Sequence, residues 1–220
     1  MPTIKPEPEK PERRSLLPVD TELRVSREEG KPVVIEGYNI IYGKWANIGW
    51  FDERISVGAA TEAIKKGMVP GLIDHKSELI VGRTGVNITV TEDDKGVFLS
   101  ITEPSAKSAR FDQLASDVES GLITGQSFAF RSNYRKEEWT FITVDEGKDV
   151  REQREIVEIA EIFDYSFVTY PAYDDTTVAK RSLEIFKAAE EGDTDIGPEL
   201  RANDRRVEAV ELKLMERNIS

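Results

Sequence analysis

The chain has 220 residues, of which 42 are acidic and 30 are basic, so its formal net charge is −12. This charge repels phosphate backbones and anionic membrane surfaces, which argues against nucleic acid and membranes as partners. The sequence has no cysteine and a single histidine, which excludes disulfides, thiolate zinc sites and a cysteine nucleophile and indicates neither a metal nor a cofactor.

The first predicted elements follow a polar N-terminal arm. Residues 1–31 hold five of the ten prolines and many charges without hydrophobic periodicity, so we expect them to be flexible. Residues 32–43, PVVIEGYNIIYG, predict strands with a bend or bulge at a glycine. Apolar residues at helical spacing in the segment 57–68 predict a short helix before a turn at Pro70 and Gly71.

The middle of the chain predicts a hairpin, a helix and further strands. Residues 78–104 read as two strands joined by a polar turn, and 106–120 read as a helix that ends before Gly121. Apolar runs after this helix predict strands that close a sheet or barrel. We therefore expect a compact domain over residues 32–181, followed by a charged tail over 182–220. The tail is expected to be solvated and partly helical, with an amphipathic helix that docks on a partner as the alternative.

A histidine and a serine form the candidate catalytic pair. His75, in LIDHKSELIVGR, carries the only imidazole of the protein, and Ser127 follows the predicted helix in GLITGQSFAF. A serine hydroxyl needs a base within hydrogen-bond reach to act as a nucleophile, and His75 can supply that base. The alternative, which spacing alone leaves open, is that His75 is a packed structural residue.

A carboxylate is the expected third member of such a site, because the chain has no second histidine. The apolar string EIAEIFDYSFVTYPAY contains Glu161 and Asp164. Alternation along a strand puts their side chains on opposite faces, so only one of them is expected to face His75. The alternative is that both acids point to solvent from an edge strand or pair with Arg151 and Arg154.

Taken together, these segments resemble the prohead (capsid maturation) proteases of tailed bacteriophages, the HK97-type family. The resemblance covers roughly residues 33–181 and rests on GYNIIYG, DHK followed by VGR, GLITGQSFAF, and DYSFVTYPAY followed by TTV and Arg181. The order of these strings is specific, with 52 residues from His75 to Ser127 and 37 from Ser127 to Asp164.

The resemblance implies an α+β fold, a mostly antiparallel β-barrel flanked by helices like that of the related herpesvirus assemblins. It implies that Ser127 is the nucleophile and His75 the general base of a serine endopeptidase without a cofactor. The family has an acidic residue two positions before a serine, which here is Asp164 before Ser166. Asp164 is therefore the first choice for the third member, and Glu161 is the second.

The resemblance also implies the substrates and the place of action. The expected partners are the major capsid protein and the scaffold protein of the procapsid. The enzyme would cut scaffold, the scaffolding segment of the capsid protein, and itself, inside the assembling procapsid in the host cytoplasm. Exposed termini are readily nicked, so the arm and the tail are expected places for self-processing. The oligomeric state stays open, with a homo-oligomer among the alternatives.

Two other classes of protein also stay open. A non-catalytic capsid assembly or scaffold protein on the same barrel would support maturation even with Ser127 replaced by alanine. A small-molecule binding barrel would need more inward aromatic side chains than the nine Phe, six Tyr and three Trp spread along this chain.

Overall fold

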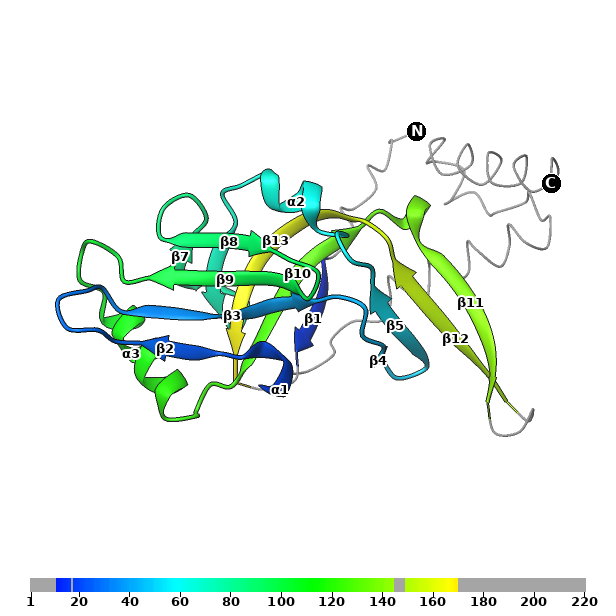
Figure 1. The fold of residues 1–220 in the computed structure, drawn as a ribbon, viewed down its shortest axis with the longest axis horizontal. Helices are drawn as coiled ribbons and strands as arrows, with labels where there is room; N and C mark the ends of the chain where they lie inside the picture. The colour runs from blue at the N-terminus through cyan, green and yellow to red at the C-terminus, as the bar shows by residue number, and fades with distance from the viewer. Residues whose placement is uncertain (1–10, 17, 145–148, 170–220) are drawn as a thin grey trace, which may run out of the picture.

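The computed structural model describes residues 11–16, 18–144 and 149–169 (Figure 1). The strands are β1 (Glu12–Leu16), β2 (Arg24–Ser26), β3 (Val34–Ile41), β4 (Ala46–Asn47), β5 (Phe51–Ile55), β6 (Pro70–Ile73), β7 (Lys76–Arg83), β8 (Ile88–Glu92), β9 (Gly96–Thr102), β10 (Gly125–Ser132), β11 (Glu138–Val144), β12 (Asp149–Ile156) and β13 (Ile159–Val168). The α-helices are α1 (Pro18–Thr21), α2 (Thr61–Lys65) and α3 (Ala109–Glu119), and a 3-10 helix spans Tyr134–Lys136.

The strands form three sheets, with the orders β1-β10-β13-β6-β7, β2-β3-β9-β8 and β11-β12-β5-β4. Most neighbouring strands are antiparallel, whereas β12 with β5 and β13 with β6 are parallel pairs. The prediction of a mostly β fold with flanking helices is confirmed. Closure into a barrel is not seen among the described strands, because a barrel requires the first and last strands of a sheet to pair.

The main hydrophobic core joins the five-stranded sheet to the β2-β3-β9-β8 sheet. Ile35 of β3 and Ile101 of β9 are fully buried in one cluster with Phe128 and Phe130 of β10. Figure 1 shows β10 and β13 running as long, curved neighbours through this part of the molecule. The core therefore supports the two strands that carry the candidate site residues.

The helix predicted at 106–120 is confirmed as α3. Ser108 caps it, because its hydroxyl accepts a hydrogen bond from the Phe111 amide over 3.3 Å. Gly121 follows the helix with a φ of +73°, a left-handed conformation that favours glycine. Phe111 and Leu114 are fully buried, so α3 closes one side of the main core. The predicted hairpin turn is also confirmed, between β8 and β9. The first of the two predicted strands is divided, because residues up to Arg83 belong to β7 of the five-stranded sheet and β8 begins only at Ile88.

The N-terminal segment differs from the sequence-based expectation. Residues 12–16 and 18–26 lie in the part predicted to be a flexible arm, yet they contain β1, α1 and β2. Strand β1 pairs antiparallel with β10, and its charged residues Glu12 and Arg14 are only 1% and 4% exposed. Hydrophobic periodicity misses such a strand, because its buried side chains are charged and find their partners on distant strands.

The region before His75 also differs from the prediction. Helix α2 is shorter than the expected 57–68, since Gly67 and Met68 adopt φ values of +65° and +63° and end it. The Met68 side chain is 63% exposed rather than part of the buried face. Pro70 begins β6 instead of a turn, because the first residue of a strand tolerates the missing amide proton.

The predicted tail at 182–220 lies outside the described residues, as does the end of the predicted domain from residue 170 to 181. Among the described helices, none has the length and apolar character needed to cross a membrane.

Candidate active site

Ser127 lies on β10, the second strand of the five-stranded sheet, between the edge strand β1 and the central strand β13. The register places it opposite Ser15 on β1 and opposite Ser166 on β13. Cross-strand neighbours share a face of the sheet, and residues two apart on a strand do so too. Ser127, Ser166 and Asp164 therefore project from the same face. Ser127 is completely buried.

His75 reaches this face from a tight turn between β6 and β7. Asp74 and His75 have φ values of +50° and +56°, as a two-residue type I′ turn requires at both positions. Such turns favour glycine or asparagine, so neighbouring groups must hold this one in place. The Asp74 amide donates to the Phe167 carbonyl over 2.9 Å, and the Thr169 amide donates to the Asp74 carboxylate over 3.1 Å. These bonds fix the turn to the end of β13.

The imidazole of His75 joins the serine to an acid. Its Nε2 atom lies 2.8 Å from Ser127 Oγ, and its Nδ1 atom lies 2.7 Å from Asp164 Oδ1. Ser166 supports both partners, because its hydroxyl donates to Asp164 Oδ1 over 2.6 Å and accepts from the His75 amide over 3.2 Å. The His75 and Asp164 side chains are 9% and 10% exposed, so the unit is largely shielded from water.

This geometry suits activation of a serine hydroxyl. A carboxylate that accepts the Nδ1 proton selects the tautomer in which Nε2 can take the proton of the serine. The same carboxylate stabilises the imidazolium that forms as the serine attacks. All three side chains meet within hydrogen-bond distance, so only the hydroxyl proton of Ser127 has to turn toward Nε2 for His75 to take it.

The other acidic candidate lies elsewhere. The expected separation onto opposite faces is wrong: a register shift on β13 interrupts the alternation, so Glu161 lies opposite Arg131 on the same face as Asp164, which lies opposite Ala129. Glu161 lies farther along the strand and pairs with Arg131, with 2.7 Å between Glu161 Oε2 and Arg131 Nη2. The arginines considered as partners in the alternative bind other acids: Arg151 contacts Asp52 over 2.6 Å, and Arg154 belongs to a buried network described below. The structure thus brings Asp164, and not Glu161, to the imidazole.

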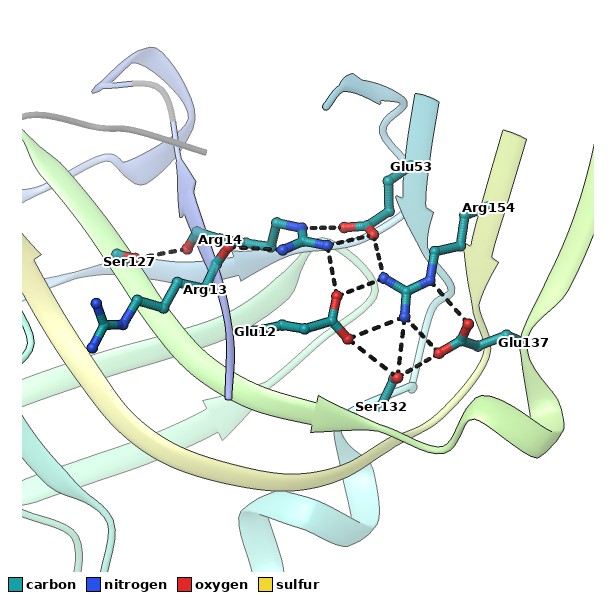
Figure 2. A network of polar contacts seen from close by, with 8 residues as sticks. All are labelled: Glu12, Arg13, Arg14, Glu53, Ser127, Ser132, Glu137 and Arg154. Atoms are coloured by element: carbon teal, nitrogen blue, oxygen red, sulfur yellow. Dashed lines mark hydrogen bonds and ion pairs between the residues drawn. The ribbon is translucent and has the colours of Figure 1, made fainter. Parts of the chain in front are cut away.

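Strand β1 covers the serine. The Ser127 hydroxyl donates a hydrogen bond to the main-chain carbonyl of Arg14 over 2.9 Å. Figure 2 shows the Arg14 side chain extending from this point into a cluster of charged groups, while Arg13 points away from the cluster. The hydroxyl of Ser127 is therefore in contact with a peptide carbonyl of its own chain.

The buried charge network connects β1 to four other parts of the fold, namely β5, β10, β12 and the segment just before β11 (Figure 2). Arg14 Nε lies 2.6 Å from Glu53 Oε1 on β5, and Arg154 Nη1 of β12 lies 2.7 Å from Glu12 Oε2. A further ion pair of 2.5 Å joins Arg154 Nη2 to Glu137 Oε1. The network consists of Glu12, Arg14, Glu53, Ser132, Glu137 and Arg154.

These contacts keep the network charged inside the protein. Burial alone would raise the pKa of Glu12, but the Arg154 and Arg14 guanidiniums outweigh it and lower the pKa to about 2. Burial would lower the pKa of Arg14, and the Glu53 carboxylate outweighs that effect and raises it. Buried ion pairs of this kind are costly to break, because one partner is left charged and unsolvated.

Sequence reasoning assigned no role to Ser166 or to Arg14. Ser166 could have been found from its spacing, since it follows Asp164 by two residues and must share its face. Arg14 carries no local signal, because its partners Glu53 and Glu12 become recognisable only in the folded chain. The described residues contain no group of three or more metal-ligating side chains arranged to hold a metal ion.

Similarity to known proteins identifies the family of this chain. A search of the curated proteins gave no match. Among solved structures, the bacteriophage T4 capsid assembly protease gp21 matches at 14% identity and a TM-score of 0.40, over 72% of this chain and 99% of that one. The family model of the caudovirus prohead serine proteases matches residues 20–189, which is most of the chain. The chain therefore belongs to the caudovirus prohead serine protease family, a family of phage capsid assembly peptidases.

Proposed function

We propose that Ser127, His75 and Asp164 are the catalytic triad of this peptidase. The observation that carries the proposal is the position of the His75 imidazole, 2.8 Å from the serine oxygen and 2.7 Å from the carboxylate. Ser127 attacks the carbonyl carbon of the scissile bond while His75 takes its proton. His75 then returns this proton to the leaving amine, and water releases the acyl group from the serine.

The proposed substrates are the scaffold protein and the scaffolding segment of the major capsid protein, together with the enzyme's own chain. Family membership supports this choice, because it places the peptidase in capsid assembly. We place the cleavage inside the assembling procapsid in the host cytoplasm. We also propose that the fold is related to that of the herpesvirus assemblins. In support, two sheets and α3 enclose a single core, as expected for a β-barrel flanked by helices.

The test is co-expression of the chain with its cognate capsid and scaffold proteins, followed by intact mass spectrometry of all products. Wild type is compared with Ser127→Ala, His75→Ala and a matched control, Ser105→Ala, which removes an exposed hydroxyl from a loop. We expect shortened capsid, scaffold or enzyme chains with wild type and Ser105→Ala only. Each catalytic variant should lose cleavage almost completely, because members of one catalytic unit act together.

Two outcomes would contradict the proposal. Identical cleavage products from Ser127→Ala and wild type would remove Ser127 as the nucleophile. Normal particle maturation without any shortened chain would favour the non-catalytic assembly protein instead.

A further inference from the structure

We propose that β1 is held in the place of a substrate strand, with the Arg14–Ser15 peptide bond at the nucleophile. The enzyme then recognises a basic side chain directly before the bond it cuts and an acidic side chain two residues earlier. This inference rests on the proposed function of Ser127. Strand β1 lies before residue 20, where the family match begins, so it is a feature of this chain outside the matched part.

The position of β1 is that of a peptide bound for cleavage. It lies in an extended conformation along β10 in antiparallel register, from Glu12 opposite Phe130 to Leu16 opposite Gln126. Adding a strand to a sheet edge is a common way of binding peptides, because the main chain supplies affinity and alternate side chains supply specificity. The Ser127 hydroxyl donates to the Arg14 carbonyl oxygen over 2.9 Å, so the nucleophile touches this peptide group. Attack on the carbonyl carbon follows when the hydroxyl turns its proton to His75 Nε2, 2.8 Å away.

The Arg14 side chain defines a site for a basic residue. Its guanidinium binds Glu53 through two bonds, of 2.6 Å from Nε and 2.8 Å from Nη2. This two-pronged contact is specific for arginine among the charged side chains. If β1 leaves, the buried Glu53 carboxylate loses both hydrogen bonds from Arg14 and keeps its contact with Arg154. The empty site therefore attracts a positive side chain.

The Glu12 side chain defines a second site, for an acidic residue. Glu12 and Arg14 lie two apart on β1 and so point to the same face. Arg154 donates to both carboxylate oxygens of Glu12, over 2.7 Å and 3.1 Å. The Arg154 side chain is completely buried, and its position is held by Glu137 as well. It thus forms a rigid receptor for a carboxylate that arrives with the substrate strand.

The groove continues beyond the bond. A cavity of about 300 Å³ lies beside β1 between α1, β3, β4 and β5. Its walls include three residues of β1, Arg14, Ser15 and Leu16. The apolar side chains of Trp45, Ile48 and Phe128 also line it. A substrate can therefore extend past the cleaved bond along an apolar wall.

The reaction at this bond follows the chemistry proposed above. Ser127 Oγ bonds to the carbonyl carbon of Arg14, and its proton passes through His75 to the nitrogen of Ser15 as the carbon–nitrogen bond breaks. Water then splits the ester, which restores the Ser127 hydroxyl and leaves a carboxylate on Arg14. The products are residues 1–14 and a chain that begins at Ser15. Release of the first product uncovers Ser127 for other substrates.

The experiment uses the full chain and follows two quantities, cleavage between residues 14 and 15 by intact mass and labelling of Ser127 by a fluorophosphonate. The variants are Arg14→Ala, Arg14→Lys and the matched control Arg13→Ala, with Ser127→Ala as the uncut reference. We expect Arg14→Ala to cut this bond about 100-fold more slowly, as the loss of a buried ion-pair partner predicts. The same variant should still label at Ser127, because β1 no longer covers the hydroxyl, whereas Ser127→Ala should not label. Arg14→Lys should restore part of the cleavage, and Arg13→Ala should match wild type.

Slow cleavage with retained labelling separates loss of the substrate strand from unfolding, which would abolish both. Cleavage at other bonds with Arg14–Ser15 intact would overturn the inference and leave the proposed function standing. Equal cleavage rates for Arg13→Ala and Arg14→Ala would do the same. Absence of both cleavage and labelling in every variant would contradict the proposed function itself.

Discussion

The hydroxyl of Ser166 donates a hydrogen bond of 2.6 Å to Asp164 Oδ1, the same oxygen that lies 2.7 Å from His75 Nδ1. Ser166 also accepts the amide proton of His75 over 3.2 Å. One buried side chain therefore orients the carboxylate and anchors the turn that carries the imidazole. Because it touches neither the serine oxygen nor a substrate carbonyl in the structure, Ser166 is a positioning residue.

Replacing Ser166 with alanine should lower kcat by about 10- to 100-fold, the effect of losing a hydrogen bond to a charged group. KM should change little, because Ser166 does not line the strand-binding edge of β10. Cleavage kinetics on a peptide substrate check both values. Ser166→Thr keeps the hydroxyl and should recover most of kcat. An unchanged kcat in Ser166→Ala would contradict the positioning role.

Asp164 and Glu161 offer a matched pair of carboxylates on one strand. Asp164→Asn should lower kcat by about 10³- to 10⁴-fold, because an amide stabilises the wrong imidazole tautomer. Glu161→Gln should leave kcat within about twofold, since its surface ion pair with Arg131 is of little energetic value. Single-turnover cleavage measures both variants. The reverse order of effects would move the third member of the triad to Glu161.

The turn at Asp74 and His75 should be sensitive to side-chain shape. Asp74→Val places a β-branched residue at a φ of +50°, which costs roughly 1–2 kcal/mol in the left-handed region. It also removes the carboxylate that accepts the Thr169 amide. We expect a lower melting temperature and a lower kcat together. Asp74→Asn keeps an acceptor and tolerates this conformation, so it is the control and should stay near wild type. A wild-type melting temperature for Asp74→Val would contradict this account.

Acid should weaken the attachment of β1. The pKa of Glu12 falls from its ordinary value of 4.5 to about 2 in the folded chain. Its stabilisation is therefore complete above about pH 4.5 and is lost as the pH falls through the folded value near 2. Thermal unfolding of full-length Ser127→Ala, which stays uncut, measures this loss between pH 7 and pH 2.

In that background, Glu12→Gln should lower the melting temperature at pH 7 and flatten its dependence on pH. Glu28→Gln, which removes an exposed carboxylate paired with Lys31, should do neither. Equal pH profiles for the two variants would show that Glu12 does not stabilise β1 through its charge.

Short sequence patterns predicted several of the helices and strands of this protein. The 3.6-residue period and its end signal at Gly121 predicted α3, and the polar turn around Gly96 predicted the β8–β9 hairpin. Both are formed by residues close in sequence, so their signals are local. The turn that carries His75 was missed because neither of its residues is a glycine, and contacts with β13 hold its conformation.

The sequence by itself determined the family of the chain and its candidate groups, namely one histidine, one serine and two acids on a strand. Only the tertiary structure decided which acid lies beside His75, because register shifts interrupt the alternation along β13 and put both acids on one face. Their different positions along the strand then decide which of them the β6–β7 turn reaches. Likewise, only the tertiary structure placed β1 against Ser127. Its charged side chains look like those of a solvated arm until Glu53 and Arg154, distant along the chain, fold around them. The physical reason is that the partners of these ion pairs lie far apart in the sequence. A strand that buries charged side chains in this way has no periodic pattern of apolar residues from which it could be predicted.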